Sequence, residues 1–422
     1  MSTCPSFKFY IPGEKGPVSF ESNLWHLPLS GNASELLETV KVPGVGTGPE
    51  PTIGDYFSAA RTFLEEENSQ LLAAALSLMA GKGEENDPIQ EVALFLEKHG
   101  AFYHPLRVKV LSETGKSAAF VLNGAVSKAG LALIKKEYQL LASLEKQVVM
   151  PYTPRVFGAG IRPFEISNSE KNNPLDDNPM DSNPDKRNVG FFLGEWFEGF
   201  REFHISTCDR EPKIAVWASN GDVDYLSLEK AAIIYEQIAH ILTVHYDVDT
   251  GEQIFPWHHA AGDFVVNSLA EGLPVKLITV RGYEPLMEFD PERTGPGEQI
   301  LPSLLFFFLN LTLRAQMDRL DGVGPLAFLG EGILKATVTG FLRGLEDKTE
   351  NALTPEKIGG GKKIKGLRNI FVTFMAGFSR EQIEALLTNL IEAWPKNASE
   401  RNLAGTHLQS HAAAVYSLFK NY

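Results

Sequence analysis

One stretch of the sequence is decisive for the fold: Phe255-Pro-Trp-His-His-Ala-Ala-Gly-Asp-Phe-Val-Val266. It begins with a loop that contains several polar residues and ends with three apolar residues. Its last three residues predict a short strand, because β-branched and aromatic side chains favour extended backbone. Two adjacent histidines and Asp263 stand just before that strand. Polar side chains gathered beside an apolar strand are typical of a functional pocket, but structural histidines after a Pro-Trp turn would give the same pattern. Both interpretations stay open on the sequence alone.

The segments on either side extend this pattern. Residues 228–245 predict a long helix with Ser227 as its N-cap, because Ile234, Ile238 and other apolar residues recur at helical spacing. Residues 275–280 predict a second strand, which Arg281 follows directly. A helix, a polar loop and two strands are therefore expected in that order.

The chain before residue 200 is expected to be rich in strands. Residues 106–110 alternate apolar and basic side chains, and a Glu-Thr-Gly turn separates them from the apolar residues 118–122, which predicts a β-hairpin. The next expected elements are a helix over about 131–146 and strands at 156–157, 161–166 and 190–197. Residues 167–188 are dominated by Asn, Asp, Ser and Pro, so we expect a flexible excursion inside a hairpin.

The two ends of the chain differ in pattern. Residues 1–99 predict an N-terminal extension with irregular structure, short strands and two helices, over about 54–79 and 89–96. From residue 300 to the end the pattern is mainly helical. The expected fold class is α+β, with a β-rich part over 100–200 and a helical part over 201–422.

Composition excludes several classes of function. The formal net charge of -14 makes a nucleic-acid partner improbable. The two cysteines, Cys4 and Cys208, do not form a disulfide framework or a cysteine-rich zinc site. The apolar run 301–313 is shorter than the ~20 residues of a membrane span, so we expect a buried core helix. With no signal peptide at the start, we expect a soluble cytoplasmic protein; the sequence does not indicate its oligomeric state.

This order of elements resembles the aminoglycoside and choline phosphotransferases, which have a protein-kinase-like fold. The resemblance covers roughly residues 100–290. Phe120-Val-Leu-Asn123 and the helix with Lys136-Glu-Tyr-Gln-Leu-Leu141 look like the family's third strand and its Glu-bearing helix, and Thr153-Pro-Arg-Val-Phe-Gly158 looks like the entry to the next strand. Phe191–Gly199, with Glu195, resembles the hinge between the lobes. The resemblance implies two lobes, with ATP and Mg²⁺ as cofactors in the cleft between them.

The family's catalytic loop, His-Gly-Asp-Leu-His-Pro-Gly-Asn, can be aligned in two registers. Its Asp orients or deprotonates the acceptor hydroxyl, and its Asn binds magnesium. The first register places Asp263 at the metal-binding Asn and His258 at the catalytic Asp, with residues 264–266 as a strand. The second places Asp263 at the base and Asn267 at the metal, but then residues 264–266 would be loop. We prefer the first register.

Several residues depart from the family pattern. Arg281 stands where the family has its second metal-binding Asp, and an arginine cannot bind a metal but can neutralise a phosphate. Asn123 stands where the third strand should carry a Lys or Arg, although Lys116 and Lys128 are nearby. Glu137 keeps the helix acid whose usual partner is that cation, although a glutamate on a helix is most often simply solvated. The expected cofactor contacts are Asn123, Glu137, Glu195 and Arg281.

Three hypotheses follow. The first is a pseudokinase that binds a nucleotide or another phosphorylated or anionic small molecule without efficient phosphotransfer. The second is an active, atypical phosphotransferase with His258 as base, Asp263 as magnesium ligand and Arg281 as phosphate clamp. The third is an unrelated enzyme that uses the His258–Asp263 loop as a metal site. His407 and His411, four residues apart on a helix, are interpreted as surface or packing residues rather than metal ligands.

Overall fold

The computed structural model divides the chain into two compact units. Unit 1 contains residues 1–139 and 155–198, and unit 2 contains residues 140–154 and 199–422. The structure describes residues 5–29, 51–80, 87–97, 103–147, 150–164, 187–208, 211–217, 221–257, 262–288, 298–349 and 366–420.

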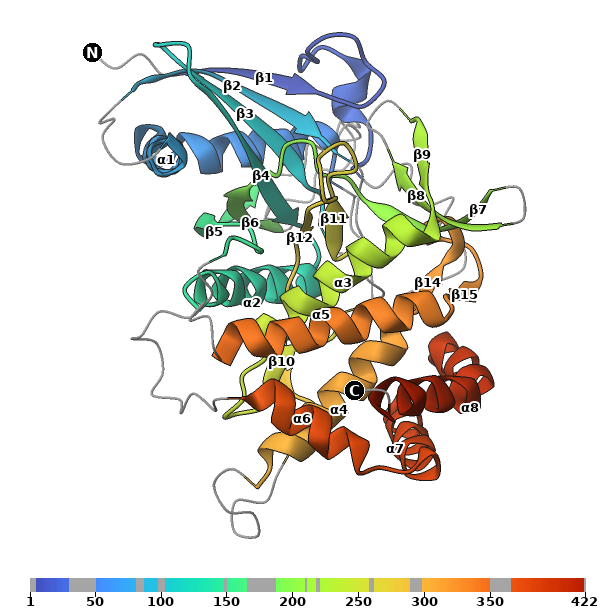
Figure 1. The fold of residues 1–422 in the computed structure, drawn as a ribbon. Coiled ribbons are helices and arrows are strands. Elements are labelled where there is room, and N and C mark those ends of the chain that lie inside the picture. Colours follow the sequence, from blue (N-terminus) through green and yellow to red (C-terminus); the bar gives the residue numbers. More distant parts are fainter. Residues whose placement is uncertain are drawn as a thin grey trace, which may run out of the picture. The chain divides into compact units, whose positions relative to one another are not determined.

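Unit 1 is built on a six-stranded mixed sheet (Figure 1). In spatial order the strands are β1 (Ser6–Tyr10), β2 (Ile89–Leu96), β3 (Leu106–Ser112), β4 (Ser117–Ala125), β6 (Arg187–Glu195) and β5 (Val156–Phe164). The pair β1–β2 is parallel and the other pairs are antiparallel. The expected hairpin is therefore confirmed as β3–β4, and the expected strand near residue 190 is β6.

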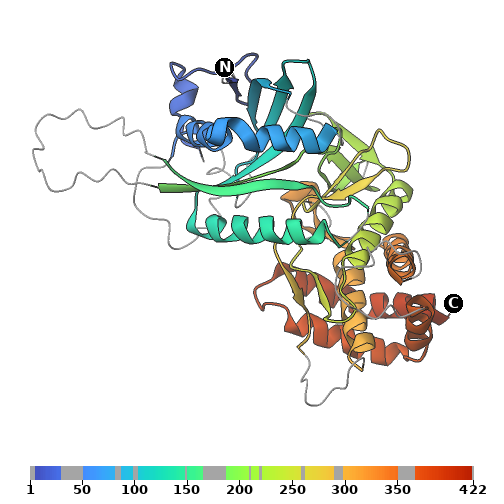
Figure 2. The same ribbon diagram turned by 90° about the vertical axis from the view of Figure 1, so that its left-hand side faces the viewer.

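Two helices lie on opposite faces of this sheet (Figure 2). The long helix α1 (Ile53–Ala80) packs its buried aromatic residues against one face, where the rings of Tyr56 and Phe191 are 5.6 Å apart. The helix α2 (Lys128–Leu144) packs on the other face, because a Cβ atom on Gly190 would meet Leu131 and Ile134. Adjacent residues of a strand point to opposite faces of the sheet. Gly190 faces α2 and Phe191 faces α1, so the two helices lie on opposite faces.

One expectation for the N-terminal residues is wrong. Residues 89–96 form strand β2 rather than a helix, and β1, β2 and α1 belong to the same unit as the β3–β4 hairpin. Val92, Leu94 and Leu96 face the core, and Ala93 on the opposite face is also buried. Consecutive buried residues interrupt the alternation of a strand, so a short apolar run of this kind cannot be told from a helix by its pattern.

Unit 2 is mainly helical. Its helices are α3 (Leu228–Val244), α4 (Ile300–Arg314), α5 (Glu331–Thr349), α6 (Leu367–Ala376), α7 (Arg380–Ala393) and α8 (Ser399–Lys420). The side chain of Ser227 accepts a hydrogen bond from the backbone N–H of Lys230, which confirms the expected N-cap of α3. The apolar run 301–313 is the buried core helix α4, as expected. Among the described residues, no helix is long and apolar enough to cross a membrane.

Unit 2 also contains strands that the sequence did not indicate. A three-stranded antiparallel sheet consists of β7 (Phe203–Cys208), β8 (Glu211–Trp217) and β9 (Val223–Leu226). Two further pairs are β10 (Glu252–Ile254) with β13 (Tyr283–Pro285), and β14 (Met317–Arg319) with β15 (Leu326–Phe328). The expectation of a mainly helical part over 201–422 holds, and these additional strands are added to it.

The packing of α3 against α5 depends on glycines of α5, and the approach is closest at Gly340. A Cβ atom on Gly340 would lie 2.0 Å from the backbone oxygen of Glu236, whereas Gly332, on the same helix, has nothing within 4 Å. The absence of a side chain at residue 340 therefore allows the two backbones to approach closely.

We predict that Gly340→Ala destabilises unit 2 by about 1–3 kcal/mol or more, because the added methyl group overpacks a backbone contact. The matched change Gly332→Ala should be neutral or stabilising by up to about 1 kcal/mol, because alanine favours a helix. Chemical denaturation of both variants measures the difference. Equal stability of the two variants would contradict the close approach of α3 and α5.

Candidate functional site

The candidate site in unit 2 is organised by the hairpin β11 (Phe264–Val266) and β12 (Val275–Leu277). Asp263 stands immediately before the first strand, and its backbone oxygen accepts a hydrogen bond from Ile278 N–H at 2.8 Å. This bond extends the pairing of the strands and holds the two outer ends of the hairpin together. Residues 264–266 are thus a strand, as the first register requires, and the loop that the second register requires is absent there.

Gly282 fixes the chain beyond the hairpin. Its backbone oxygen accepts a hydrogen bond from Phe255 N–H at 3.0 Å, and a Cβ atom at this position would lie 2.2 Å from the Phe255 oxygen. Only glycine permits this approach without a backbone shift. The contact places Arg281 at the end of the hairpin that carries Asp263.

Asp263 and Arg281 form an ion pair. Arg281 Nη1 lies 2.6 Å from Asp263 Oδ1, and the exposed fractions of the side chains are 25% and 2%. The contact satisfies the distance of an ion pair but not the angle of a hydrogen bond, so Arg281 Nη1 has no hydrogen-bond acceptor among the described residues. A buried carboxylate needs a nearby positive charge, because desolvation of an isolated ion is costly. Arg281 supplies that charge.

This pair changes what the site can bind. Magnesium is normally held by one or two carboxylates together with water and phosphate oxygens. Here one oxygen of Asp263 already faces a guanidinium group, and the other expected metal-binding position is itself Arg281. A guanidinium group carries several donors in a fixed plane and pairs well with phosphate. The ion pair therefore occupies the carboxylate that the sequence assigned to a metal ion.

The predicted base is His258. His258, His259, Ala260 and Ala261 lie outside the described residues. The roles proposed for His258, as a base or as part of a metal site, therefore stay predictions. Trp257, just before them, is fully buried.

Glu137 of unit 1 is buried rather than solvated, so the interpretation as a solvated helix residue is wrong. Its exposed fraction is 1%, and its Oε2 accepts a hydrogen bond from the Tyr103 hydroxyl at 2.6 Å. Asn123 lies on β4 opposite Phe192 of β6 and is half-buried. Lys116 and Lys128 are exposed. A tyrosine hydroxyl is thus one partner of the helix glutamate, and nothing in the sequence singled out Tyr103.

Glu195 ends strand β6 and contacts Arg155 at the start of β5. Its Oε2 accepts hydrogen bonds from Arg155 N–H and Nε–H at 3.3 and 3.4 Å, and 15% of its side chain is exposed. The Arg155 guanidinium also donates to the backbone oxygen of Leu78 on α1. This network joins β5, β6 and α1. The role of Glu195 as a cofactor contact stays a prediction.

The histidine pair near the C-terminus has a packing role, as expected. Gln316 Nε2 donates to His411 Nδ1 at 2.9 Å, and Thr312 Oγ1 lies 3.2 Å from His411 Nε2. Burial lowers the pKa of His411 to about 4, so the ring is neutral at physiological pH. The ring of His407 stacks on Phe328 with 4.2 Å between centroids.

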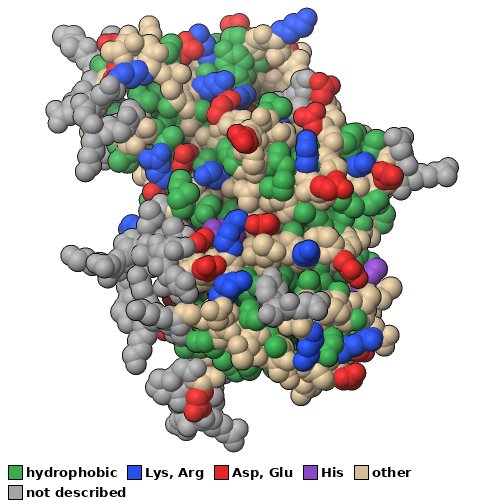
Figure 3. Space-filling model, viewed as in Figure 1, with side chains coloured by type: hydrophobic (Ala, Val, Ile, Leu, Met, Phe, Trp, Pro, Cys, Tyr) green, Lys and Arg blue, Asp and Glu red, His purple; other side chains and the backbone are tan. Residues whose placement is uncertain are grey.

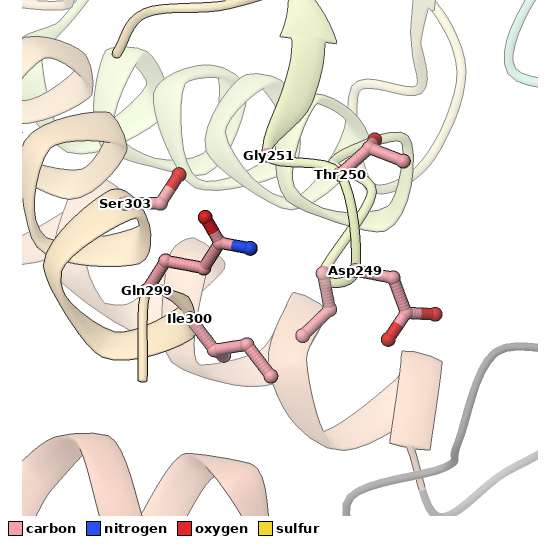
Figure 4. Close-up of a pocket in the computed structure, with 7 residues that line it drawn as sticks. Asp249, Thr250, Gly251, Gln299, Ile300 and Ser303 are labelled. Atoms are coloured by element: carbon pink, nitrogen blue, oxygen red, sulfur yellow. The ribbon is translucent and has the colours of Figure 1, made fainter. Parts of the chain in front are cut away.

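A small depression lies elsewhere in unit 2, between the 248–251 turn and the start of α4 (Figure 4). Its cavity volume is about 10 Å³, which is far below the range of roughly 300–1,000 Å³ for small-molecule sites. Asp249 points away from Ser303, whose hydroxyl is already paired with that of Tyr246 at 2.7 Å. This depression is therefore too small for a nucleotide.

We predict that Arg281→Gln lowers the free energy of unfolding by about 3 kcal/mol, because it leaves the Asp263 carboxylate buried without its cation. Asp263→Asn should cost less, since part of Arg281 reaches solvent. The double variant Asp263→Asn/Arg281→Gln should be more stable than Arg281→Gln alone. Denaturant unfolding of all three variants gives the coupling energy. Additive effects would show that the two side chains do not interact.

Within the described residues, no cluster of three or more His, Cys, Asp or Glu side chains is arranged to hold a metal ion. Among known proteins, no family model matches the chain, and no curated protein matches it. The resemblance to the kinase-like phosphotransferases therefore stays a prediction from sequence motifs.

Proposed function

We propose that this chain is a pseudokinase of the kinase-like phosphotransferase fold. Its two units would correspond to the small and large lobes. It would bind a nucleotide or another phosphorylated small molecule through Arg281, without efficient phosphotransfer. The ion pair between Asp263 and Arg281 carries this proposal, because in the first register these two residues align with the positions that bind magnesium in phosphotransferases.

The order of elements supports the fold assignment. The hairpin β3–β4 is followed by α2 with its buried Glu137, and then by the neighbouring strands β5 and β6. In unit 2, α3 is followed by the segment that ends in Asp263 and by the hairpin β11–β12. Kinases place their strand lysine, helix glutamate and metal-binding residues on elements in this order.

The residues also support loss of efficient catalysis. Phosphoryl transfer depends on positioning and on stabilisation of charge by metal ions and a strand lysine. Here the strand position is Asn123, and Arg281 replaces one metal ligand. The loss of these charges should lower the rate by several orders of magnitude. ATP without Mg²⁺ is the expected form of a nucleotide ligand, and a cytoplasmic location is part of the same proposal.

The test is thermal unfolding with ATP, ADP and GTP, each with Mg²⁺ or with EDTA. We predict stabilisation by nucleotide in EDTA, because Arg281 contacts phosphate directly. The double variant Asp263→Asn/Arg281→Gln should lose this shift, since it lacks the cation without leaving a buried charge. Arg343→Gln is the matched control, because Arg343 is half-exposed and pairs with Glu236 at a distance of 2.7 Å.

Three results separate the alternatives. Stabilisation that requires Mg²⁺ and is lost in Asp263→Asn would favour the active phosphotransferase instead. Metal bound without any nucleotide would favour a metal-dependent enzyme. No shift with any nucleotide at millimolar concentration would contradict nucleotide binding by this chain.

A further inference from the structure

Arg314, the last residue of α4, has a guanidinium group that is held in place by three neighbours in unit 2. Its Cζ atom lies 4.3 Å from the ring centre of Trp394 and 5.4 Å from that of Phe255. Its Nε donates a hydrogen bond to Asn310 Oδ1 at 3.0 Å. Cation–π contacts with two rings and one hydrogen bond together fix the plane of the group.

The terminal nitrogens of this group have no hydrogen-bond acceptor among the described residues, because the only hydrogen bond of the guanidinium is the one from Nε. The side chain is half-buried, and burial lowers the pKa of Arg314 to about 10. The terminal nitrogens are not among the fully buried donors that lack a hydrogen-bond partner, so they reach solvent. A ligand from solution can therefore contact them.

Charged residues of both signs lie near the connection between α7 and α8. Arg401 Nη1 donates to the backbone oxygen of Trp394 at 3.3 Å, and the ring of Trp394 contacts Arg314. Arg319 Nη2 donates to Ser399 Oγ, at the start of α8, at 3.3 Å. Glu400 opposes them, since its field raises the pKa of Arg314, and its Oε2 accepts a hydrogen bond from Ser399.

From this geometry we propose that Arg314 binds an oxyanion, either the carboxylate or the phosphate group of a small molecule. The two terminal nitrogens of a fixed guanidinium present parallel N–H donors, which match two oxygens of such a group. The rings of Trp394 and Phe255 keep these donors oriented before the anion arrives, which reduces the entropy cost of binding. This site does not depend on the proposed nucleotide function of Arg281.

The full-length protein is titrated with potassium phosphate and with potassium succinate, and potassium chloride at equal ionic strength is the control. Isothermal calorimetry measures the affinity. We expect saturable binding of at least one oxyanion at millimolar concentration, and the anion that binds more tightly identifies the preferred group. Arg314→Gln should weaken it by about tenfold or more, as expected for loss of a hydrogen-bonded charge.

Three further variants complete the design. Arg314→Lys keeps the charge but not the paired donors, so it should weaken binding even if Arg314→Gln does not fold. Arg343→Gln should bind like the unchanged protein. The Asp263→Asn/Arg281→Gln variant removes any phosphate contact through Arg281 and should retain the binding that depends on Arg314, which separates this site from the nucleotide site. The proposal is overturned if neither oxyanion binds more strongly than chloride, or if the variants at Arg314 bind as tightly as the unchanged protein.

Discussion

The buried carboxylate of Asp263 is the constraint on which the candidate site depends. With 2% of its side chain exposed, it must either take up a proton or lie beside a positive charge. Phosphotransferases meet this requirement with a metal ion that arrives with the nucleotide. Here Arg281 meets it within the chain itself. The hairpin β11–β12 and the glycine at residue 282 bring the two side chains together, so the local fold supports the pair.

A related change is present in unit 1. Glu137 keeps its place on the helix after the β3–β4 hairpin, but the Tyr103 hydroxyl is one of its partners and the strand position carries Asn123. The carboxylates of Glu137 and Asp263 are thus both buried, each within its own unit. On the face in Figure 3, basic and acidic side chains are interspersed.

The sequence predicted elements well where one face is apolar and the other polar. The helices α1 and α3 and the hairpin β3–β4 have this pattern. The N-cap at Ser227 was predicted from its residue type. The sequence predicted β2 wrongly, because the three consecutive buried residues 92–94 interrupt the alternation of that strand. At the candidate site it indicated Asp263 and Arg281 individually. It could not indicate their contact, or the partner of Glu137, because these depend on distances between residues far apart in the chain.

The central claim is that Arg281 takes the place of a metal ion beside Asp263. Binding of Mn²⁺, which suits the same carboxylate ligands as Mg²⁺, tests it most directly when the free ion is followed by electron paramagnetic resonance. The account predicts that the protein removes no more free Mn²⁺ in the presence of ADP than ADP alone does. Saturable binding of one Mn²⁺ per chain that disappears in Asp263→Asn would contradict it.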